Sequence, residues 1–491
     1  MPFLRKINPV LLVIIICILS RIPILASADL RLDSDECVLG LMAKHLYKNQ
    51  DYSIYFWGQT YGISIIEEFF VVPFYMAHGI AALAVKLGML CLWTIGVTFF
   101  YKSLRQIRPH NQKEAFLITL LLIASPSWAL WSMKARGGYL TAFVFSNVAL
   151  YLLFHARYNK KTLTYIIAGI IFSIVFESQL FWLSGLIPLV AYKFIKDKNI
   201  LKPLLMVGSG IGCELLASSY KKGIDVFYRP PSIQLTKSDL FSRINRIPDF
   251  LYTHMHGTYH FSWAHPPNFF AAFFAIVITA IIFMLLVHAV VSLFQKEMRS
   301  GLFIFSVAFI PATFLYSLFT PEMQYRYLLP VTAYTLIALF LLLEKYPMTK
   351  LIKSHIIVLL IIGFAGVASF WKSQWLRSER EPLLNAIKFL ENNNIKYVYC
   401  ADYTFQWDIM FLTNEKITER FFTEPGRHPV YDFAVDKALA SGEKTAVFGN
   451  SDRRFGEKFE HYEMDNVYYI SVNPTKESLQ SIFEFKPIPG N

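Results

Sequence analysis

The sequence predicts an α-helical polytopic membrane protein with a small C-terminal α/β domain outside the membrane. Of its 491 residues, 55% are hydrophobic and only 17% are charged, whereas soluble globular domains have about a quarter charged residues. Apolar runs recur along most of the chain and stop before residue 376. We therefore divide the sequence into a transmembrane domain, residues 1–375, and a soluble extracytoplasmic domain, residues 376–491.

The first apolar run follows a basic start and resembles a signal peptide, because Ala26-Ser27-Ala28 has the small residues of a cleavage site. We expect the run to be retained as the first span. Arg21 interrupts the approach to the site, and many more apolar runs follow.

About eleven runs meet or approach the length of about 20 residues that a transmembrane helix needs. They lie at residues 9–26, 79–101, 116–131, 138–155, 163–176, 180–195, 202–219, 268–294, 301–319, 328–343 and 354–371. An odd number of spans places the two chain ends on opposite sides of the membrane.

Lysine and arginine predict the orientation, because short cytoplasmic loops are rich in them. All the short loops on the side of the N-terminus are basic, and they hold Arg5 and Lys6; Lys102, Arg105, Arg108 and Lys113; Arg157, Lys160 and Lys161; Lys193, Lys196, Lys198 and Lys202; Lys296 and Arg299; Lys345, Lys350 and Lys353. We therefore expect a multi-pass protein of the inner (plasma) membrane with a cytoplasmic N-terminus. These loops also explain the net charge of +12, so nucleic-acid binding is not expected.

The first outer loop, residues 27–78, predicts two helices that lie in the membrane interface. Apolar residues recur at helical spacing from Val38 to Tyr47, and a second apolar stretch runs from Ile65 to Phe74. Between them lies an aromatic and glycine-rich turn, and aromatic side chains favour the headgroup level. The second large outer loop, residues 220–267, is basic and contains several histidines.

The soluble domain is predicted from short alternating segments. Pro382 to Asn392 predicts an amphipathic helix and Tyr397 to Cys400 a strand. Further elements are expected at Phe405 to Leu412, at a strand near 417–421, at a helix over 430–441 and at Thr445 to Phe448. This order is typical of a small α/β domain.

Three carboxylates, Asp33, Asp35 and Glu36, directly follow the first span. Carboxylates at a bilayer surface are costly unless they face water, a metal or a substrate. One of them could act as a general base that takes a proton from an acceptor hydroxyl. Alternatively, Ser34 or Asp35 caps a helix that begins near Cys37.

Several motifs on the outward side together resemble the GT-C superfamily of integral-membrane glycosyltransferases. The resemblance is strongest to the bacterial branch related to protein O-mannosyltransferases and the aminoarabinose transferase of lipid A. The motifs are Asp35-Glu36, Trp57-Gly58-Gln59-x-Tyr61-Gly62-x-Ser64-x-x-Glu67, Arg136-Gly137-Gly138-Tyr139, Glu177-Ser178-Gln179 and Arg326-Tyr327-Leu328-Leu329-Pro330.

The resemblance implies a polyprenyl-phosphate sugar donor, inversion at the anomeric carbon and a general base in the first outer loop. One more aspartate than usual precedes the motif, so the motif alone does not fix which carboxylate is the base. We rank Asp35 first, Asp33 second and Glu36 third. The resemblance also implies that basic residues at outer helix ends hold the donor phosphate.

Arg326 and Arg136 suit this task, because a guanidinium binds phosphate through two parallel hydrogen bonds. Arg326 could instead extend to the interface, as arginines at span ends often do, and Lys134 competes with Arg136. The other residues expected to bind substrate belong to the same motifs: Tyr327, Tyr139, Glu177, Gln59 and Tyr61. For Glu177 the alternatives are sugar hydroxyls or a pair with an arginine.

A metal site is a further hypothesis. Glu67 with Asp35 could bind Mg²⁺ or Mn²⁺ through hard oxygen ligands, although Glu67 could equally be an ordinary acid on the polar face of its helix. His254, His256 and His260 suggest zinc less strongly, because no nearby cysteine or acid completes the set.

The sequence therefore favours a hexosyl- or pentosyltransferase that works among membrane lipids. Its acceptor would be lipid A or lipopolysaccharide, another envelope glycan, or a protein. A lipid-linked sugar transporter or flippase is an alternative, but it predicts charges at mid-span and repeated halves. A glycan polymerase or ligase remains open because of the basic loop 220–267.

Overall fold

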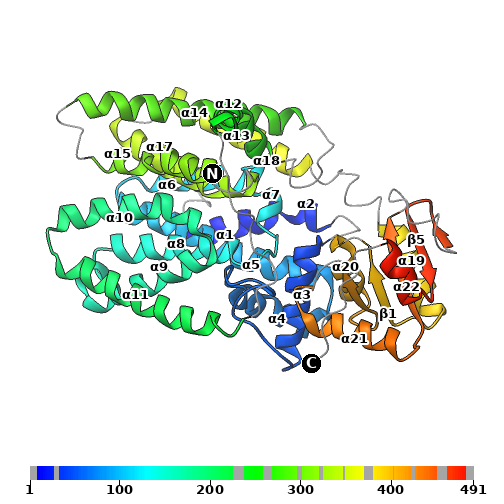
Figure 1. Ribbon diagram of the computed structural model, residues 1–491. Coiled ribbons are helices and arrows are strands. Elements are labelled where there is room, and N and C mark those ends of the chain that lie inside the picture. The colour runs from blue at the N-terminus through cyan, green and yellow to red at the C-terminus, as the bar shows by residue number, and fades with distance from the viewer. Residues whose placement is uncertain are drawn as a thin grey trace.

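The computed structural model describes residues 8–26, 32–224, 237–257, 268–295, 301–319, 324–346, 349–369, 380–401, 403–421, 426–450 and 462–482. Figure 1 shows a bundle of helices with an α/β domain at one end of it. The helix α3 (Ser34–Tyr47) lies between these two parts, so it takes part in both.

Each of the eleven predicted apolar runs contains a helix. These helices are α1 (Pro9–Leu19), α2 (Ile22–Leu25), α5 (Ala82–Ile107), α6 (Gln112–Ile123), α7 (Ser127–Trp131), α8 (Tyr139–Phe154), α9 (Thr162–Ser178), η3 (Leu180–Trp182), α10 (Leu183–Asp197), α11 (Leu201–Lys221), α14 (Phe269–Phe294), α15 (Leu302–Val307), α16 (Phe309–Phe319), η5 (Tyr325–Leu328), α17 (Leu329–Lys345) and α18 (Lys350–Ser369). Within the described ranges, five are long and apolar enough to cross a membrane: Ala82–Ile107, Leu201–Lys221, Phe269–Phe294, Tyr325–Leu343 and Lys350–Ser369. The number of eleven spans stays a prediction.

Some predicted runs are broken into two helices. Pro126 separates α6 from α7, because a residue before proline avoids the helical conformation. At the break between α1 and α2, the buried Arg21 donates hydrogen bonds to the Ser132 Oγ (2.7 Å) and to the Ile123 carbonyl (3.0 Å). These bonds join the first helices to α6 and to the residue after α7.

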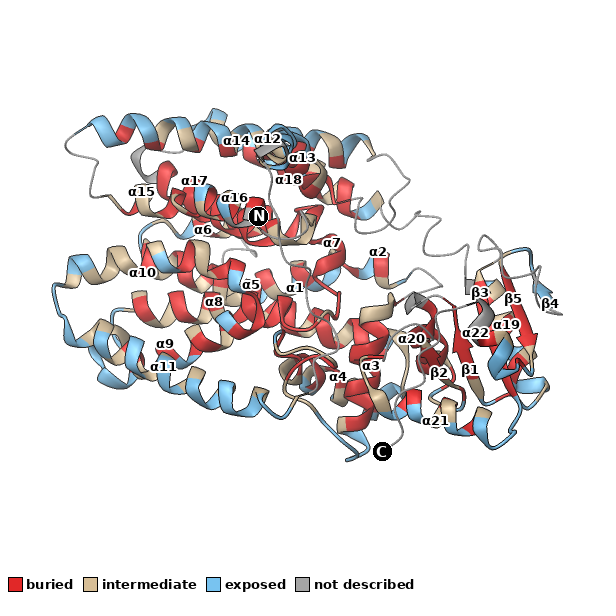
Figure 2. Ribbon diagram, viewed as in Figure 1, coloured by how far each residue is buried: buried red, intermediate tan, exposed pale blue. Residues whose placement is uncertain are grey.

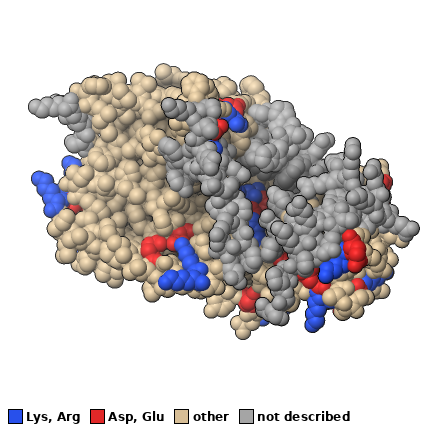
Figure 3. All heavy atoms as spheres, viewed as in Figure 1, with Lys and Arg blue, Asp and Glu red and all other residues tan. Residues whose placement is uncertain are grey.

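Burial differs sharply between inner and outer helices (Figure 2). The central α5 is mostly buried, whereas α11 and α14 expose large apolar side chains such as Leu216 and Phe294. Figure 3 shows one face of the bundle, in the same view as Figure 1. Where residues are described, this face is largely uncharged, and charged side chains lie at its margins and on the α/β domain. Such a surface suits helices surrounded by lipid.

The first outer loop forms two helices as predicted, α3 and α4 (Ile65–His78). From Glu36 to His45, α3 is buried against other parts of the protein, and its position in the membrane interface stays a prediction. Its Gly40 packs against Phe411 of the α/β domain and Tyr75 of α4. The second outer loop contributes two further helices, α12 (Lys237–Asn245) and α13 (Ile247–His256), which follow α11 and precede α14 along the chain.

The α/β domain contains one five-stranded sheet in the order β2-β1-β3-β5-β4. The strands are β1 (Tyr397–Cys400), β2 (Thr418–Phe421), β3 (Thr445–Asn450), β4 (Tyr462–Met464) and β5 (Tyr468–Val472), and the helices are α19 (Arg380–Asn392), α20 (Tyr403–Leu412), α21 (Pro429–Ala440) and α22 (Lys476–Ile482). β1 is parallel to β2 and β3, and β5 is antiparallel to β3 and β4. The amphipathic helix predicted from Pro382 to Asn392 is confirmed by α19, and the strand predicted from Tyr397 to Cys400 is confirmed by β1. β4, β5 and α22 were not predicted.

Candidate functional site

The three carboxylates that follow the first span each have their own set of partners. Asp33 is the N-cap of α3, and its carboxylate accepts a hydrogen bond from the Glu36 backbone N–H at 3.0 Å. In turn, the Glu36 carboxylate accepts a hydrogen bond from the Asp33 backbone N–H at 3.1 Å, and it also forms an ion pair with the buried Lys86. Asp33 also pairs with Lys134 at 2.6 Å. The expected cap at Ser34 or Asp35 is therefore wrong, and Asp35 is free of this role.

Asp35 instead lies between two arginines. Its Oδ2 accepts a hydrogen bond from the Arg136 Nε at 2.7 Å and lies 2.7 Å from the Arg136 Nη2 in an ion pair. Its Oδ1 accepts a hydrogen bond from the Arg427 Nη2 at 2.9 Å. Burial alone would raise the pKa of this carboxyl, but the two guanidinium charges outweigh it and hold the pKa below its usual value. Asp35 is therefore ionised at neutral pH.

Arg136 is held in place by the turn that follows it. Gly137 and Gly138 have φ angles of 60° and 95°, which favour glycine, and their N–H groups donate to Glu67 at 3.0 and 2.8 Å. Burial raises the pKa of Glu67 to about 7 although these amides oppose the rise. Glu67 therefore orders the arginine turn.

The hypothesis that Glu67 and Asp35 share a metal ion is not supported by this geometry. Within the described ranges, no group of three or more His, Cys, Asp or Glu side chains close enough to share an ion includes either residue. The metal hypothesis stays a prediction, whereas the alternative that Glu67 is an ordinary acid on the polar face of its helix is wrong, since Glu67 is fully buried.

The aromatic and glycine-rich turn joins the separate motifs. The Gly62 N–H donates to the Glu177 carbonyl at 2.8 Å, and a side chain on Gly62 would meet the Gly137 carbonyl. Gly58 packs closely against the backbone of Arg427, whose guanidinium lies 4.9 Å from the centre of the Phe56 ring. The turn therefore contacts the arginine turn, the α9 end and the α/β domain together.

Arg326 and three tyrosines complete the site. Arg326, in η5, is close enough for its charge to act on Asp35, Tyr139 and Tyr61. Tyr327 stacks on Phe181 with 4.4 Å between ring centres, and Tyr61 is 48% exposed. Gln59 lies half-buried in the same turn as Tyr61.

Two guanidinium groups near Asp35 keep unused donors. The Nε of Arg326 and the Nη1 of Arg427 are buried and have no hydrogen-bond partner among the described residues. A buried donor without a partner is costly, and the one Asp35 carboxylate already pairs with two guanidinium groups, those of Arg136 and Arg427. This arrangement suits an anionic ligand with several oxygen atoms.

Other sequence-predicted residues lie apart from this group. The carboxylate of the buried Glu177 pairs with Lys221 of α11 at 2.5 Å, so its charged partner is a lysine rather than an arginine, and its binding to sugar hydroxyls stays a prediction. His254 and His256 are buried on α13, where the His254 Nε2 lies 3.3 Å from the Thr332 Oγ1. His260 lies outside the described residues.

Arg427 was missed by the sequence analysis. It precedes α21 by two residues and is 392 positions away from Asp35. No local pattern marks it, because a single arginine before a helix is ordinary on any soluble domain. Only the packing of the α/β domain on α3 brings it to the site.

Comparison of the fold with solved structures gives a clear match. The crystal structures of ArnT from Cupriavidus metallidurans in the apo state and bound to undecaprenyl phosphate match with TM-scores of 0.59 and 0.58. Each is 10% identical in sequence, and the matches cover 94% of this chain and 97% and 98% of theirs. No protein-family model and no curated protein matches the sequence. The chain therefore has the fold of ArnT, a GT-C lipid A aminoarabinose transferase, as the sequence resemblance implied.

Proposed function

We propose that this protein is a membrane glycosyltransferase that takes a sugar from a polyprenyl-phosphate donor. The observation that carries the proposal is the pairing of Arg136 and Arg427 with Asp35, together with buried donors on Arg427 and Arg326 that are left for a ligand. A phosphate ester offers the charge and the oxygen atoms that these donors lack. The match to an ArnT structure bound to undecaprenyl phosphate supports a lipid-linked donor.

In the proposed reaction, Asp35 is the general base. It takes the proton from an acceptor hydroxyl while the hydroxyl oxygen bonds to the anomeric carbon of the sugar. The bond from that carbon to the phosphate oxygen breaks in the same step, and polyprenyl phosphate leaves. Asp35 then returns the proton to water, and no covalent enzyme intermediate forms.

The arginines would have two tasks in this reaction. They stabilise the negative charge that grows on the leaving phosphate. Before the donor binds, they also hold Asp35 as a weak base, because the paired carboxylate has a lowered pKa. A bound phosphate would share the guanidinium charges and so make Asp35 more basic in the donor complex than in the free enzyme.

The acceptor and the transferred group complete the proposal. We expect the site to face outward and the acceptor to be lipid A or lipopolysaccharide, another envelope glycan or a protein, with the α/β domain covering the site. The transferred group would be a hexose or a pentose.

The test is mass spectrometry of envelope glycolipids and glycoproteins. It compares the wild type, a deletion strain and strains that express Asp35→Asn or Asp197→Asn at normal abundance. Asp197 is the matched control, because it also pairs with two cations, Lys193 and Lys202, but lies on another part of the bundle.

We expect one defined sugar mass to disappear in the deletion and Asp35→Asn strains and to persist with Asp197→Asn. A wild-type profile in the deletion strain would contradict the transferase function. A wild-type profile with Asp35→Asn alone would remove Asp35 as the base.

A further inference from the structure

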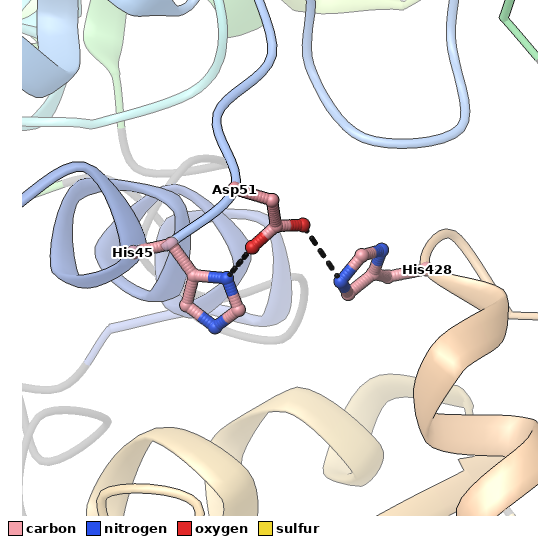
Figure 4. Close-up of side chains that lie close together, drawn as sticks. All are labelled: His45, Asp51 and His428. Carbon is pink, nitrogen blue, oxygen red and sulfur yellow. Dashed lines mark hydrogen bonds and ion pairs between the residues drawn. The ribbon is translucent and has the colours of Figure 1, made fainter. Parts of the chain in front are cut away.

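A second cluster of chemically active side chains lies where the α/β domain meets the first outer loop. His45 is near the end of α3, Asp51 is in the segment after it, and His428 directly precedes α21. Figure 4 shows both imidazole rings turned toward the Asp51 carboxylate. The Nδ1 of His45 contacts Asp51 Oδ1, and the Nε2 of His428 lies 3.2 Å from Asp51 Oδ2. One ligand atom from each residue lies within 4.8 Å of the others.

The ring of His45 is oriented as metal-binding histidines usually are. Its second nitrogen, Nε2, lies 2.8 Å from the Glu415 Oε1 and 3.0 Å from the Tyr431 hydroxyl. A carboxylate on the far nitrogen fixes the ring and strengthens it as a ligand.

The ring of His428 is fixed by stacking instead. It lies on the Trp57 ring with 4.3 Å between ring centres and 16° between planes.

The cluster is open on one side only. The side chains of His45 and His428 are 9% and 15% exposed, whereas that of Asp51 is 52% exposed. An ion could therefore enter past Asp51, and a water molecule could fill the fourth position of a tetrahedral site. Two imidazoles and one carboxylate suit zinc, whereas magnesium and calcium prefer oxygen ligands alone.

We propose that His45, Asp51 and His428 bind one divalent transition-metal ion, zinc in preference to the others, and that this ion fastens the α/β domain to the first outer loop. Two ligands come from the segment that holds Asp35, and the third is adjacent to Arg427. The bound ion would therefore also hold Arg427 beside Asp35. The metal site itself does not depend on the transferase function.

The first experiment measures zinc binding to the purified full-length protein in detergent after treatment with a chelator. Calorimetric titration with zinc chloride is compared for the wild type, His428→Ala, Asp51→Asn and His78→Ala. Asp51→Asn keeps the size of a half-exposed side chain, so it tests the site without opening the interface. His78 is an exposed histidine at the end of α4 and serves as the matched control.

We expect one zinc ion per chain for the wild type and His78→Ala, and affinities weaker by at least about 10-fold for His428→Ala and Asp51→Asn. Magnesium chloride should give no heat of binding. The absence of saturation at one equivalent would overturn the proposal, and so would equal affinities in all four proteins. In either case the three side chains would form only a hydrogen-bonded group.

The second experiment tests whether the ion fastens the two parts. Hydrogen exchange of the amides in α3 and α21 is followed with zinc and with chelator. Exchange should slow on addition of zinc in the wild type and His78→Ala, and stay the same in Asp51→Asn. Zinc binding without any change in exchange would overturn the fastening role. These readouts need no donor or acceptor, so their failure is separate from failure of the proposed reaction.

Discussion

At the scale of single residues, the acidic cluster shows how three similar carboxylates acquire different tasks. Asp33 and Glu36 begin α3 through reciprocal bonds to each other's backbone. This reciprocal pattern satisfies N–H groups that the helix leaves without partners. Asp35 lies between them in the sequence but points to Arg136 and Arg427. The sequence ranked Asp35 first as the base, and this ranking stays a prediction.

Replacement of Arg326 tests the phosphate role. We expect Arg326→Ala to lower turnover of the lipid-linked donor by about 100-fold, the usual cost of losing one group that stabilises developing charge. Protein abundance should stay normal, because the Arg326 Nε makes no hydrogen bond among the described residues. The measurement is product formation per amount of protein in membranes. Arg326→Lys should recover part of the activity, and an equal loss of abundance and activity would make Arg326 structural.

The His45–Glu415 pair predicts a pH dependence in the metal-free protein. Burial opposes charge on His45, but its bonds to Glu415 and Asp51 raise its pKa above 6.5. Glu415 has its pKa lowered to about 2, since His45, Lys44 and Tyr431 outweigh its burial. The contribution of His45 to the free energy of unfolding is complete below about pH 6.5 and is lost as the pH rises through the pKa of His45 in the folded protein. The contribution of Glu415 to the free energy of unfolding is complete above about pH 4.5 and is lost as the pH falls toward 2.

The pair is therefore strongest between about pH 4.5 and 6.5. We expect the unfolding temperature to fall more steeply above pH 6.5 in the wild type than in His45→Gln. His428 acts with the opposite sign, because its lowered pKa makes its contribution to stability grow as the pH rises through 6.5, and it is present in both proteins. Parallel curves for the two proteins would contradict this assignment.

At the scale of elements, apolar periodicity predicted the helices well and their surroundings poorly. Every predicted run contains a helix, because length and hydropathy are local properties of the sequence. The burial of α3 was not predicted, since it depends on the contact of Gly40 with Phe411 of a distant segment. The role of Glu67 was missed for the same reason, because its amide partners come from another motif.

The turn at Gly137 and Gly138 offers a test of this element. Gly138→Ala should cost about 1–3 kcal/mol of stability, because φ is 95° and the new Cβ would lie 3.0 Å from the Ser178 carbonyl oxygen. It should also reduce activity by moving Arg136. Gly79→Ala is the control, with a φ of 76° but open space around it. Thermal unfolding and donor turnover are measured for both, and similar activities would contradict the positioning role of the turn.

At the scale of the whole molecule, the site is shared between the membrane part and the α/β domain. The fold and the motifs that meet at the site were predictable, because each rests on short segments and a family resemblance. The contribution of Arg427 was not predictable, because it arises only when α20 packs on α3 and the α/β domain closes over Asp35.

Arg427→Ala tests whether the α/β domain takes part in the reaction. We expect donor turnover to fall by at least about 10-fold, since a charge-assisted bond to Asp35 and a buried donor are lost. Lys416→Ala removes an exposed charge from the same domain and should leave turnover unchanged. Equal activity in the two variants would limit the domain to a covering role.

The predicted orientation has its own test. A reporter fused after Asn491 should lie outside the cytoplasm, because the basic loops place the N-terminus inside and the number of spans is expected to be odd. Its accessibility to an impermeant reagent in intact cells is the measurement. A reporter found in the cytoplasm would overturn the orientation together with the outward site.

The pairing of Asp35 with Arg427 also has a consequence for biosynthesis. The two residues are 392 positions apart, so the ribosome inserts the acidic segment long before it makes the second arginine. A nascent chain that is already threaded into the bilayer would hold Asp35 and Arg136 without the partner that completes the site. For the proposed transferase, activity would therefore appear only after the α/β domain has folded onto α3, which would keep half-made copies from consuming the lipid-linked sugar.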